Sequence, residues 1–189
     1  MLDAENSGDG SEKKLPGSVV LLHWLVAASV FFLFASSWWM LSLPLPSDDF
    51  TYREFPFQLH KNIGITVFVA VIFMAVRRVT YLLGDINTKE GWLQRLAVWD
   101  HLLLYLLLVV CCLSGYMSSS YSGWATSLWW LIDLPLWTAE NDELNILFSD
   151  IHMFSCWALL VLLLLHIGAA IYHALDNDGA IDRMFRLRD

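Results

Sequence analysis

Four long apolar segments, separated by polar stretches, dominate this chain. They cover roughly residues 17–43, 57–83, 98–120 and 149–175. Each reaches the length of about 20 residues that an α-helix needs to cross the hydrocarbon core of a bilayer. Apolar residues make up 57% of all 189 residues, a larger share than soluble globular domains use. The predicted fold is an all-α integral membrane four-helix bundle in which consecutive helices are antiparallel.

A shorter apolar stretch lies between the third and fourth segments, at residues 124–137. Asp133 and Pro135 interrupt it, and the uninterrupted part is too short to span a bilayer. We expect this stretch to lie along the membrane interface, because aromatic rings favour the depth of the lipid headgroups. The rings expected at that depth are Trp129, Trp130 and Trp137.

Polar tails flank the apolar region. Residues 1–16 are mostly polar and predict a disordered tail, and residues 176–189 form a short tail at the other end. The first apolar segment is too long for the core of a signal peptide, and no small-residue cleavage site ends it. We therefore expect residues 17–175 to form one transmembrane domain that retains its first helix.

Lysine and arginine are distributed unequally between the two sides of this four-span layout. Nine of the eleven basic residues lie on the side of the two tails. An excess of basic residues marks the cytoplasmic side of a membrane protein, so both termini are predicted to be cytoplasmic. The nine residues are Lys13, Lys14, Arg77, Arg78, Lys89, Arg95, Arg183, Arg186 and Arg188.

The opposite, outer face is acidic. Its loops and the adjoining helix ends carry eight acidic residues, against only Arg53 and Lys61. This surface is either an ordinary solvated loop surface or a face that repels anions and favours a basic redox protein as partner. The eight residues are Asp48, Asp49, Glu54, Asp133, Glu140, Asp142, Glu143 and Asp150.

Two histidines share one stripe of the last apolar segment. His152 and His166 are 14 residues apart, a separation that ends about 40° short of four helical turns and spans roughly 21 Å along the axis. Ionisable side chains inside a bilayer are costly and are by default functional candidates. Because histidine is a common axial ligand of haem iron, the stripe predicts two stacked haem sites.

Depth in the membrane supplies a partner for each of these histidines. His60 lies near the outer end of the second segment, at the level of His152, whereas His23 lies near the cytoplasmic end of the first segment, at the level of His166. Two imidazoles from facing helices fill both axial positions of a porphyrin iron, which favours electron transfer over oxygen activation. The predicted metal ligands are therefore His23, His60, His152 and His166.

Two further histidines lie near the cytoplasmic boundary. His101 opens the third segment, and His173 follows His166 by one heptad. Several roles remain open for each of them. Each could be an interfacial polar residue, contact haem propionates, carry protons or replace one partner of the inner pair. For every histidine the alternative is a simple hydrogen bond to a neighbouring helix, worth about 1 kcal/mol.

Other chemistry has no clear signature in the sequence. Cys111, Cys112 and Cys156 lie inside predicted spans without a metal-binding spacing, and we expect them to pack within the bundle. No Cys-x-x-Cys-His motif for covalent haem attachment occurs. The chain also has no phosphate-cradling glycine loop and no nucleophile motif, and nothing in it indicates a nucleic-acid partner.

Taken in order, these motifs resemble the bacterial di-haem cytochrome b561 family, four-helix membrane cytochromes that include the superoxide:ubiquinone oxidoreductases (superoxide oxidases). The matching pieces are LLHWLVA, LHKNIG, HLLLYLLLVVCCLSGYMSSSYSG and LPLW, followed by the spacing of His152, His166 and His173. The resemblance implies two b-type haems, one held by His23 and His166 and one by His60 and His152. It also implies exchange of electrons with the quinone pool, possible binding of ubiquinone, and a place in the bacterial inner membrane.

Two features depart from that family. Many relatives carry an arginine fourteen residues after the second-span histidine, where this chain has Met74, and its arginines follow later as Arg77 and Arg78. The acidic outer face should also slow the encounter with superoxide, which is an anion. We therefore rank general electron transfer through two haems above superoxide oxidation. The remaining alternatives are a membrane-anchor subunit docked to a larger redox complex and a cofactor-free assembly factor.

Overall fold

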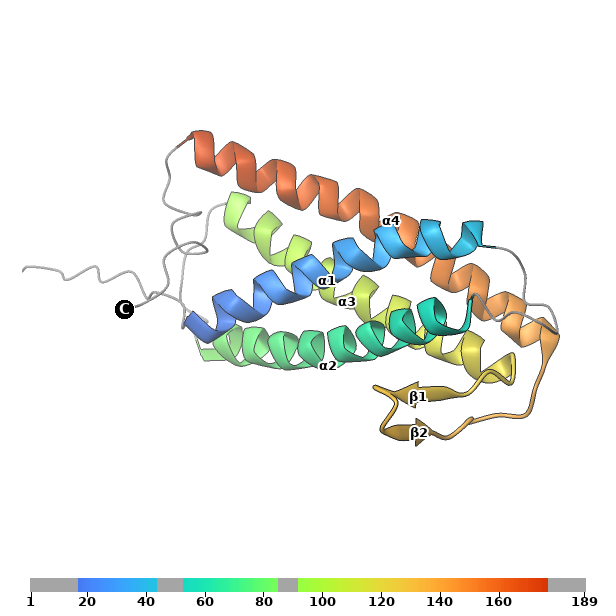
Figure 1. The fold of residues 1–189 in the computed structure, drawn as a ribbon. Coiled ribbons are helices and arrows are strands. Elements are labelled where there is room, and N and C mark those ends of the chain that lie inside the picture. Colours follow the sequence, from blue (N-terminus) through green and yellow to red (C-terminus); the bar gives the residue numbers. More distant parts are fainter. Residues whose placement is uncertain (1–16, 44–52, 85–91, 177–189) are drawn as a thin grey trace, which may run out of the picture.

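Four long helices and one short β-hairpin form the fold (Figure 1). The structure, a computed structural model, describes residues 17–43, 53–84 and 92–176. In chain order the elements are α1 (Gly17–Ser42), α2 (Glu54–Gly84), α3 (Trp92–Tyr121), β1 (Thr126–Leu128), β2 (Ile132–Leu134) and α4 (Asp142–Leu175). The predicted tail at residues 1–16, and all but the first residue of the tail at 176–189, lie outside the described residues.

All four helices are long and apolar enough to cross a membrane. This confirms the predicted all-α four-helix membrane bundle, whereas the orientation of its termini stays a prediction. Three of the helices begin earlier than the apolar pattern predicted, and α4 shows why. Its 34 residues span about 51 Å, more than the hydrocarbon core of about 30 Å.

The early start of α4 is encoded in polar residues. The side chain of Asn141 accepts a hydrogen bond from the Leu144 backbone N–H at 2.9 Å, and Asp142 and Glu143 occupy the first turn. An asparagine cap and acidic residues at this position stabilise a helix N-terminus. The polar residues expected in a loop therefore form the first turns of the helix.

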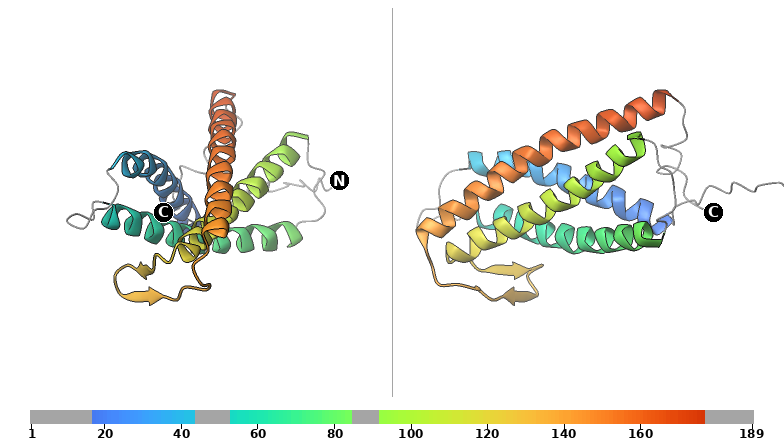
Figure 2. Two further views of the ribbon diagram at one scale, coloured as in Figure 1. Left: turned by 90° about the vertical axis from the view of Figure 1, so that its right-hand side faces the viewer. Right: turned by 180° about the vertical axis from the view of Figure 1, so that it is seen from behind.

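The helices do not pack equally against one another. The α3–α4 contact is the most extensive, and α1 packs on α2, which also packs on α3. By contrast, the backbone of α4 approaches those of α1 and α2 at few points at most. Figure 2 shows the same arrangement, with α4 diverging from α2 toward its C-terminal end.

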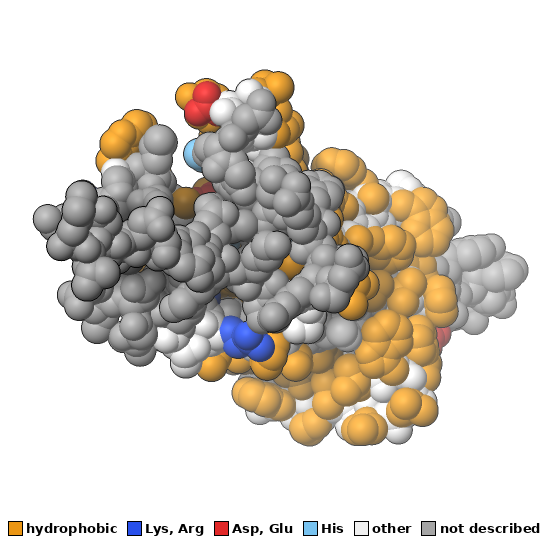
Figure 3. All heavy atoms as spheres, turned by 90° about the vertical axis from the view of Figure 1, so that its left-hand side faces the viewer, with side chains coloured by type: hydrophobic (Ala, Val, Ile, Leu, Met, Phe, Trp, Pro, Cys, Tyr) orange, Lys and Arg blue, Asp and Glu red, His pale blue; other side chains and the backbone are white. Residues whose placement is uncertain are grey.

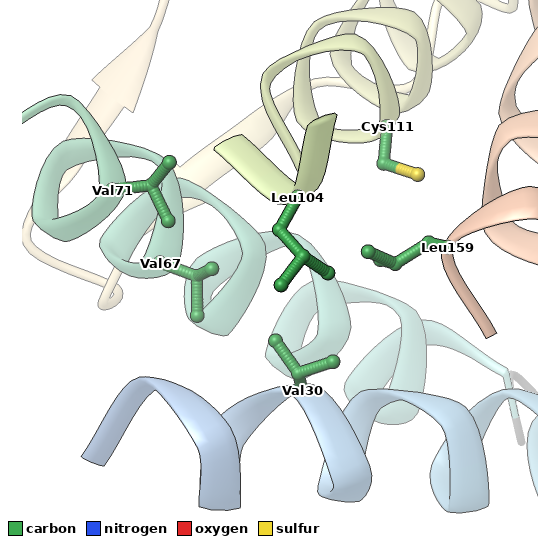
Figure 4. Packing of buried hydrophobic residues seen from close by; sticks show 6 residues of the cluster. All are labelled: Val30, Val67, Val71, Leu104, Cys111 and Leu159. Carbon is green, nitrogen blue, oxygen red and sulfur yellow. The ribbon is translucent and has the colours of Figure 1, made fainter. Parts of the chain in front are cut away.

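A small apolar cluster lies where the four helices meet (Figure 4). Cys111 belongs to it and Cys156 packs against it, as expected for cysteines that serve in packing. Most other large apolar side chains are exposed, and they cover much of the described surface in Figure 3. A lipid-facing surface accounts for this exposure. The cluster consists of Val30, Val67, Val71, Leu104, Cys111 and Leu159.

The apolar stretch between α3 and α4 contains the antiparallel hairpin β1–β2, which the sequence did not predict. Trp129 and Trp130 at its tip adopt positive φ angles of 49° and 57°. The Trp129 backbone N–H donates to Asn62 Oδ1 at 3.0 Å, and its indole N–H donates to Thr66 Oγ1 at 3.2 Å. These bonds fix the hairpin on the outer half of α2.

Candidate functional site

Two pairs of histidine rings lie close together across the bundle, one at each of the predicted levels. The inner pair consists of His23 on α1 and His166 on α4, with ring centroids 6.5 Å apart. The outer pair consists of His60 on α2 and His152 on α4, with ring centroids 6.4 Å apart. Both pairs join α4 to a helix whose backbone it scarcely approaches. The names inner and outer follow the orientation predicted from charge.

A carboxylate on α3 orients His166 of the inner pair. His166 Nδ1 lies 2.7 Å from Asp100 Oδ2. Because a carboxylate only accepts hydrogen bonds, the proton of a neutral imidazole lies on Nδ1. The lone pair of Nε2 is then available to a metal, an arrangement common among metal-binding histidines.

A backbone carbonyl on α3 orients His152 of the outer pair. His152 Nδ1 lies 2.8 Å from the carbonyl oxygen of Cys111. That carbonyl has a second lone pair beyond the one used by the helix, and a glycine at position 115 leaves it accessible. A Cβ added at Gly115 would lie 3.1 Å from both Cε1 and Nδ1 of His152. A side chain at this position would therefore displace the His152 ring, by a few tenths of an ångström for a Cβ alone.

The two boundary histidines lie differently. The ring of His101 contacts that of His166 edge-on, with centroids 5.3 Å apart and planes at 88°. Its Nδ1 lies 2.6 Å from the backbone carbonyl of Ala97 on its own helix, so His101 lies beside the inner pair with one ring nitrogen already engaged. His173 lies one heptad beyond His166 and contacts the ring of Tyr172 at 5.7 Å.

The geometry of both pairs fits a haem iron. A bond from a metal to an imidazole nitrogen is about 2 Å long, so two imidazoles on opposite sides of one iron have centroids roughly 6 Å apart. Both observed separations agree with this value, whereas the His101–His166 separation is shorter. The Nδ1 atoms of His23 and His60 are buried and have no hydrogen-bond partner among the described residues.

Each imidazole pair lacks the further protein ligands that a metal ion without a porphyrin would need. Within residues 17–43, 53–84 and 92–176, no three His, Cys, Asp or Glu side chains converge as metal ligands. Two imidazoles alone suit a metal whose remaining ligands come from a porphyrin. The pairs therefore fit haem better than a metal ion held by protein alone.

Sequence reasoning missed the two acceptors that orient the α4 histidines. In the sequence Asp100 precedes His101 at the predicted start of the third span, where a carboxylate is ordinarily a solvated residue. Its predicted depth, close to that of His166, is a signal that could have identified it. The Cys111 carbonyl has no side-chain signal, and only Gly115, one turn later, indicates it.

A partly buried cation accompanies the outer pair. Lys61 follows His60 in α2, and its Nζ donates to the Ala125 carbonyl at 2.8 Å and to Ser119 Oγ at 3.3 Å. It also lies 5.1 Å from the centre of the Trp124 ring, a cation–π distance. Lys61 thus links α2 to the segment that leads into the hairpin.

Comparison with known proteins gives two concordant results. The model of a family described as prokaryotic cytochrome b561 matches residues 14–187. Cytochrome b561 homolog 2 of Escherichia coli (strain K12) is 30% identical over 164 residues, which cover 86% of each chain. Cytochrome b561 homolog 1 of the same organism is 26% identical over 173 residues, covering 89% of this chain and 95% of the relative.

Proposed function

The chain belongs to the prokaryotic cytochrome b561 family, and on that premise we propose that it carries electrons across the membrane through two b-type haems. Membership makes it a multi-pass protein of the bacterial inner membrane that uses b-type haem in electron transport. The number of haems, their ligands and the exchange with quinone are the proposal.

The single observation that carries the proposal is the presence of two matched imidazole pairs at two levels of one bundle. The inner and outer pairs have nearly the same centroid separation. Their α4 members are roughly 21 Å apart along the helix, about two thirds of the 30 Å hydrocarbon core. When bound, haem supplies one-electron transfer. Two sites at these levels bridge most of the bilayer.

The redox partners follow from stoichiometry and surface charge. A quinone takes up two electrons and two protons to become a quinol, so two one-electron transfers reduce one quinone. Two superoxide anions that each lose one electron become two molecules of dioxygen. The two electrons released are the number that one quinone needs, so superoxide is a chemically balanced donor. The described part of the outer face is acidic, however, and its six acidic side chains are exposed. We therefore rank superoxide below a protein donor with a basic docking surface.

One alternative assigns the same haems to a membrane-anchor subunit of a larger oxidoreductase. The outer face would then be its docking surface. Copurification of a partner in fixed ratio, when the chain is extracted in a mild detergent, would support the anchor. Quinone reduction by the chain alone, with a soluble electron donor, would support a stand-alone electron carrier.

Haem content and redox titration of the purified full chain test the proposal. We expect two haems per chain, a sharp band in the reduced-minus-oxidised spectrum typical of bis-imidazole b haem, and two one-electron components. A folded but colourless protein would overturn the proposal and would favour a cofactor-free assembly role. A single haem per fully loaded chain would refute the two-site arrangement.

A further inference from the structure

The two α4 imidazoles receive different support from the same neighbouring helix. His166 is held by the Asp100 side chain and His152 by the Cys111 backbone carbonyl, at 2.7 and 2.8 Å. The first acceptor is a carboxylate and the second is neutral. A hydrogen bond to a carboxylate raises the basicity of a metal-bound imidazole, so the two sites differ in a property that controls reduction potential.

We propose that Asp100 is a positioning residue that fixes His166 and lowers the reduction potential of the inner haem relative to the outer one. The proposal rests on the proposed function, because it takes His166 as a haem ligand. The negative charge favours the oxidised form, which carries one more positive charge than the reduced form. The short bond also holds the imidazole in one orientation and one tautomer.

The contacts around Asp100 direct its effect to His166. The same oxygen, Oδ2, lies 3.9 Å from His101 Nδ1. That nitrogen already lies 2.6 Å from the Ala97 carbonyl, so the short contact of Asp100 is the one with His166. The side chains of Asp100 and His166 are 23% and 24% exposed. Water therefore screens this pair only in part.

Other charges at this end of the bundle act in different directions. Arg78 on α2 lies close enough to interact electrostatically with His101, and a cation there favours the reduced form of a nearby haem. His23 and His101 complete the cluster of rings around His166. A test must therefore change Asp100 alone and leave these groups in place.

The decisive variant is Asp100→Asn in the full chain, studied by redox titration. Asparagine keeps an acceptor oxygen but removes the charge. Loss of a ligand-orienting partner typically costs about 10- to 100-fold in metal affinity or activity, and we take the same range for the preference between oxidation states. If the preference for the oxidised form falls by that factor, the midpoint of one component rises by about 60–120 mV, at 59 mV per tenfold change. The other component should keep its midpoint.

Two companion variants separate positioning from charge. Asp176→Asn removes one charge from an exposed residue, about 15 Å beyond His166 along the helix axis, and should shift both components only slightly. Asp100→Glu keeps the carboxylate, so its midpoint should lie closer to that of the unaltered chain than the midpoint of Asp100→Asn does. The low-spin electron paramagnetic resonance signal of the oxidised inner haem, which depends on the ligand ring, should change in Asp100→Asn and not in Asp176→Asn.

The outcomes are distinguishable. A shift of one component alone, or selective loss of one haem, in Asp100→Asn supports the proposal. Equal shifts of both components, equal loss of both haems, or a shift no larger than in Asp176→Asn would overturn it. Failure of the proposed function would be seen in a different measurement, because the wild-type chain would then hold no haem or only one.

Discussion

The inner and outer pairs resemble each other in spacing and differ in the angle between the ring planes, 51° against 80°, and in their surroundings. Their centroid separations differ by only 0.1 Å. Around the inner pair lie the Asp100 carboxylate and a third imidazole, that of His101. The outer pair has a neutral carbonyl acceptor, and the next residue after His60 is the cation Lys61. One helix thus presents two similar imidazoles, and its neighbours make them different.

α3 is the element that distinguishes the two sites. It supplies both acceptors, Asp100 and the Cys111 carbonyl, and it has the most extensive contact with α4. A negative charge at the inner site and a cation near the outer one favour a lower potential inside than outside. With that order, the inner haem would be the harder of the two to reduce.

Removing one ligand from each pair gives the largest expected effect. His166→Ala and His152→Ala should each reduce the haem content to about half, because a haem with one axial ligand lost binds much more weakly. They should delete different components from the redox titration. His173→Ala, on the same helix, should keep both haems. Equal haem loss in His173→Ala, or full content in His166→Ala, would break the assignment of the pairs.

A bulky residue at position 115 should disturb the outer site alone. In Gly115→Leu the new side chain occupies space beside the His152 ring, where a Cβ alone would lie 3.1 Å from two ring atoms. We expect loss of the outer component and retention of the inner one, measured as haem content and redox components of the purified variant. Gly115→Ala should shift the outer component without removing it. Loss of the inner component would show that the two sites are not independent.

The sequence was sufficient to predict the features that depend only on helix rise and membrane thickness. Four runs of apolar residues long enough for a bilayer correspond to α1, α2, α3 and α4. Depth along each run was also enough to pair His23 with His166 and His60 with His152 in space. Both results depend on helix rise and membrane thickness, which are properties of the chain and the bilayer alone.

The missed features depend on contacts between distant parts of the chain. The hairpin tip at Trp129 and Trp130 has none of the Asn-Gly or Gly-Gly signals of tight β-turns, and its conformation is stabilised by Asn62 and Thr66 on α2. Asp100 acquires its importance only when α4 brings His166 beside it. Neither relation is visible from local pattern.

The acidic outer face predicts a salt effect on any reaction with superoxide. Like charges repel, and salt at about 0.15 M screens them beyond about 8 Å. Superoxide-driven quinone reduction should therefore be slow at low ionic strength and rise severalfold as salt is added, in a steady-state assay with the loaded chain. Sodium and potassium salts should act alike. A fast rate that falls with added salt would reverse the ranking of superoxide below a protein donor.

The smallest effect is expected where the acceptor is backbone. Cys111→Ala keeps the carbonyl that holds His152 and removes only a thiol in contact with Ser155 and Cys156. The outer midpoint should change by less than about 20 mV, or roughly twofold in equilibrium at 59 mV per tenfold. A shift as large as that expected in Asp100→Asn would mean that side chains control both sites alike.

Because α4 is one continuous helix, the number of residues between His152 and His166 sets both their separation and the angle between them. Inserting one residue between His152 and His166 would turn one imidazole by about 100° relative to the other and add 1.5 Å to their separation. Both rings would face their partners again only after three or four added residues, close to a whole turn. The number of residues between His152 and His166 therefore decides whether both imidazole pairs can form in one bundle.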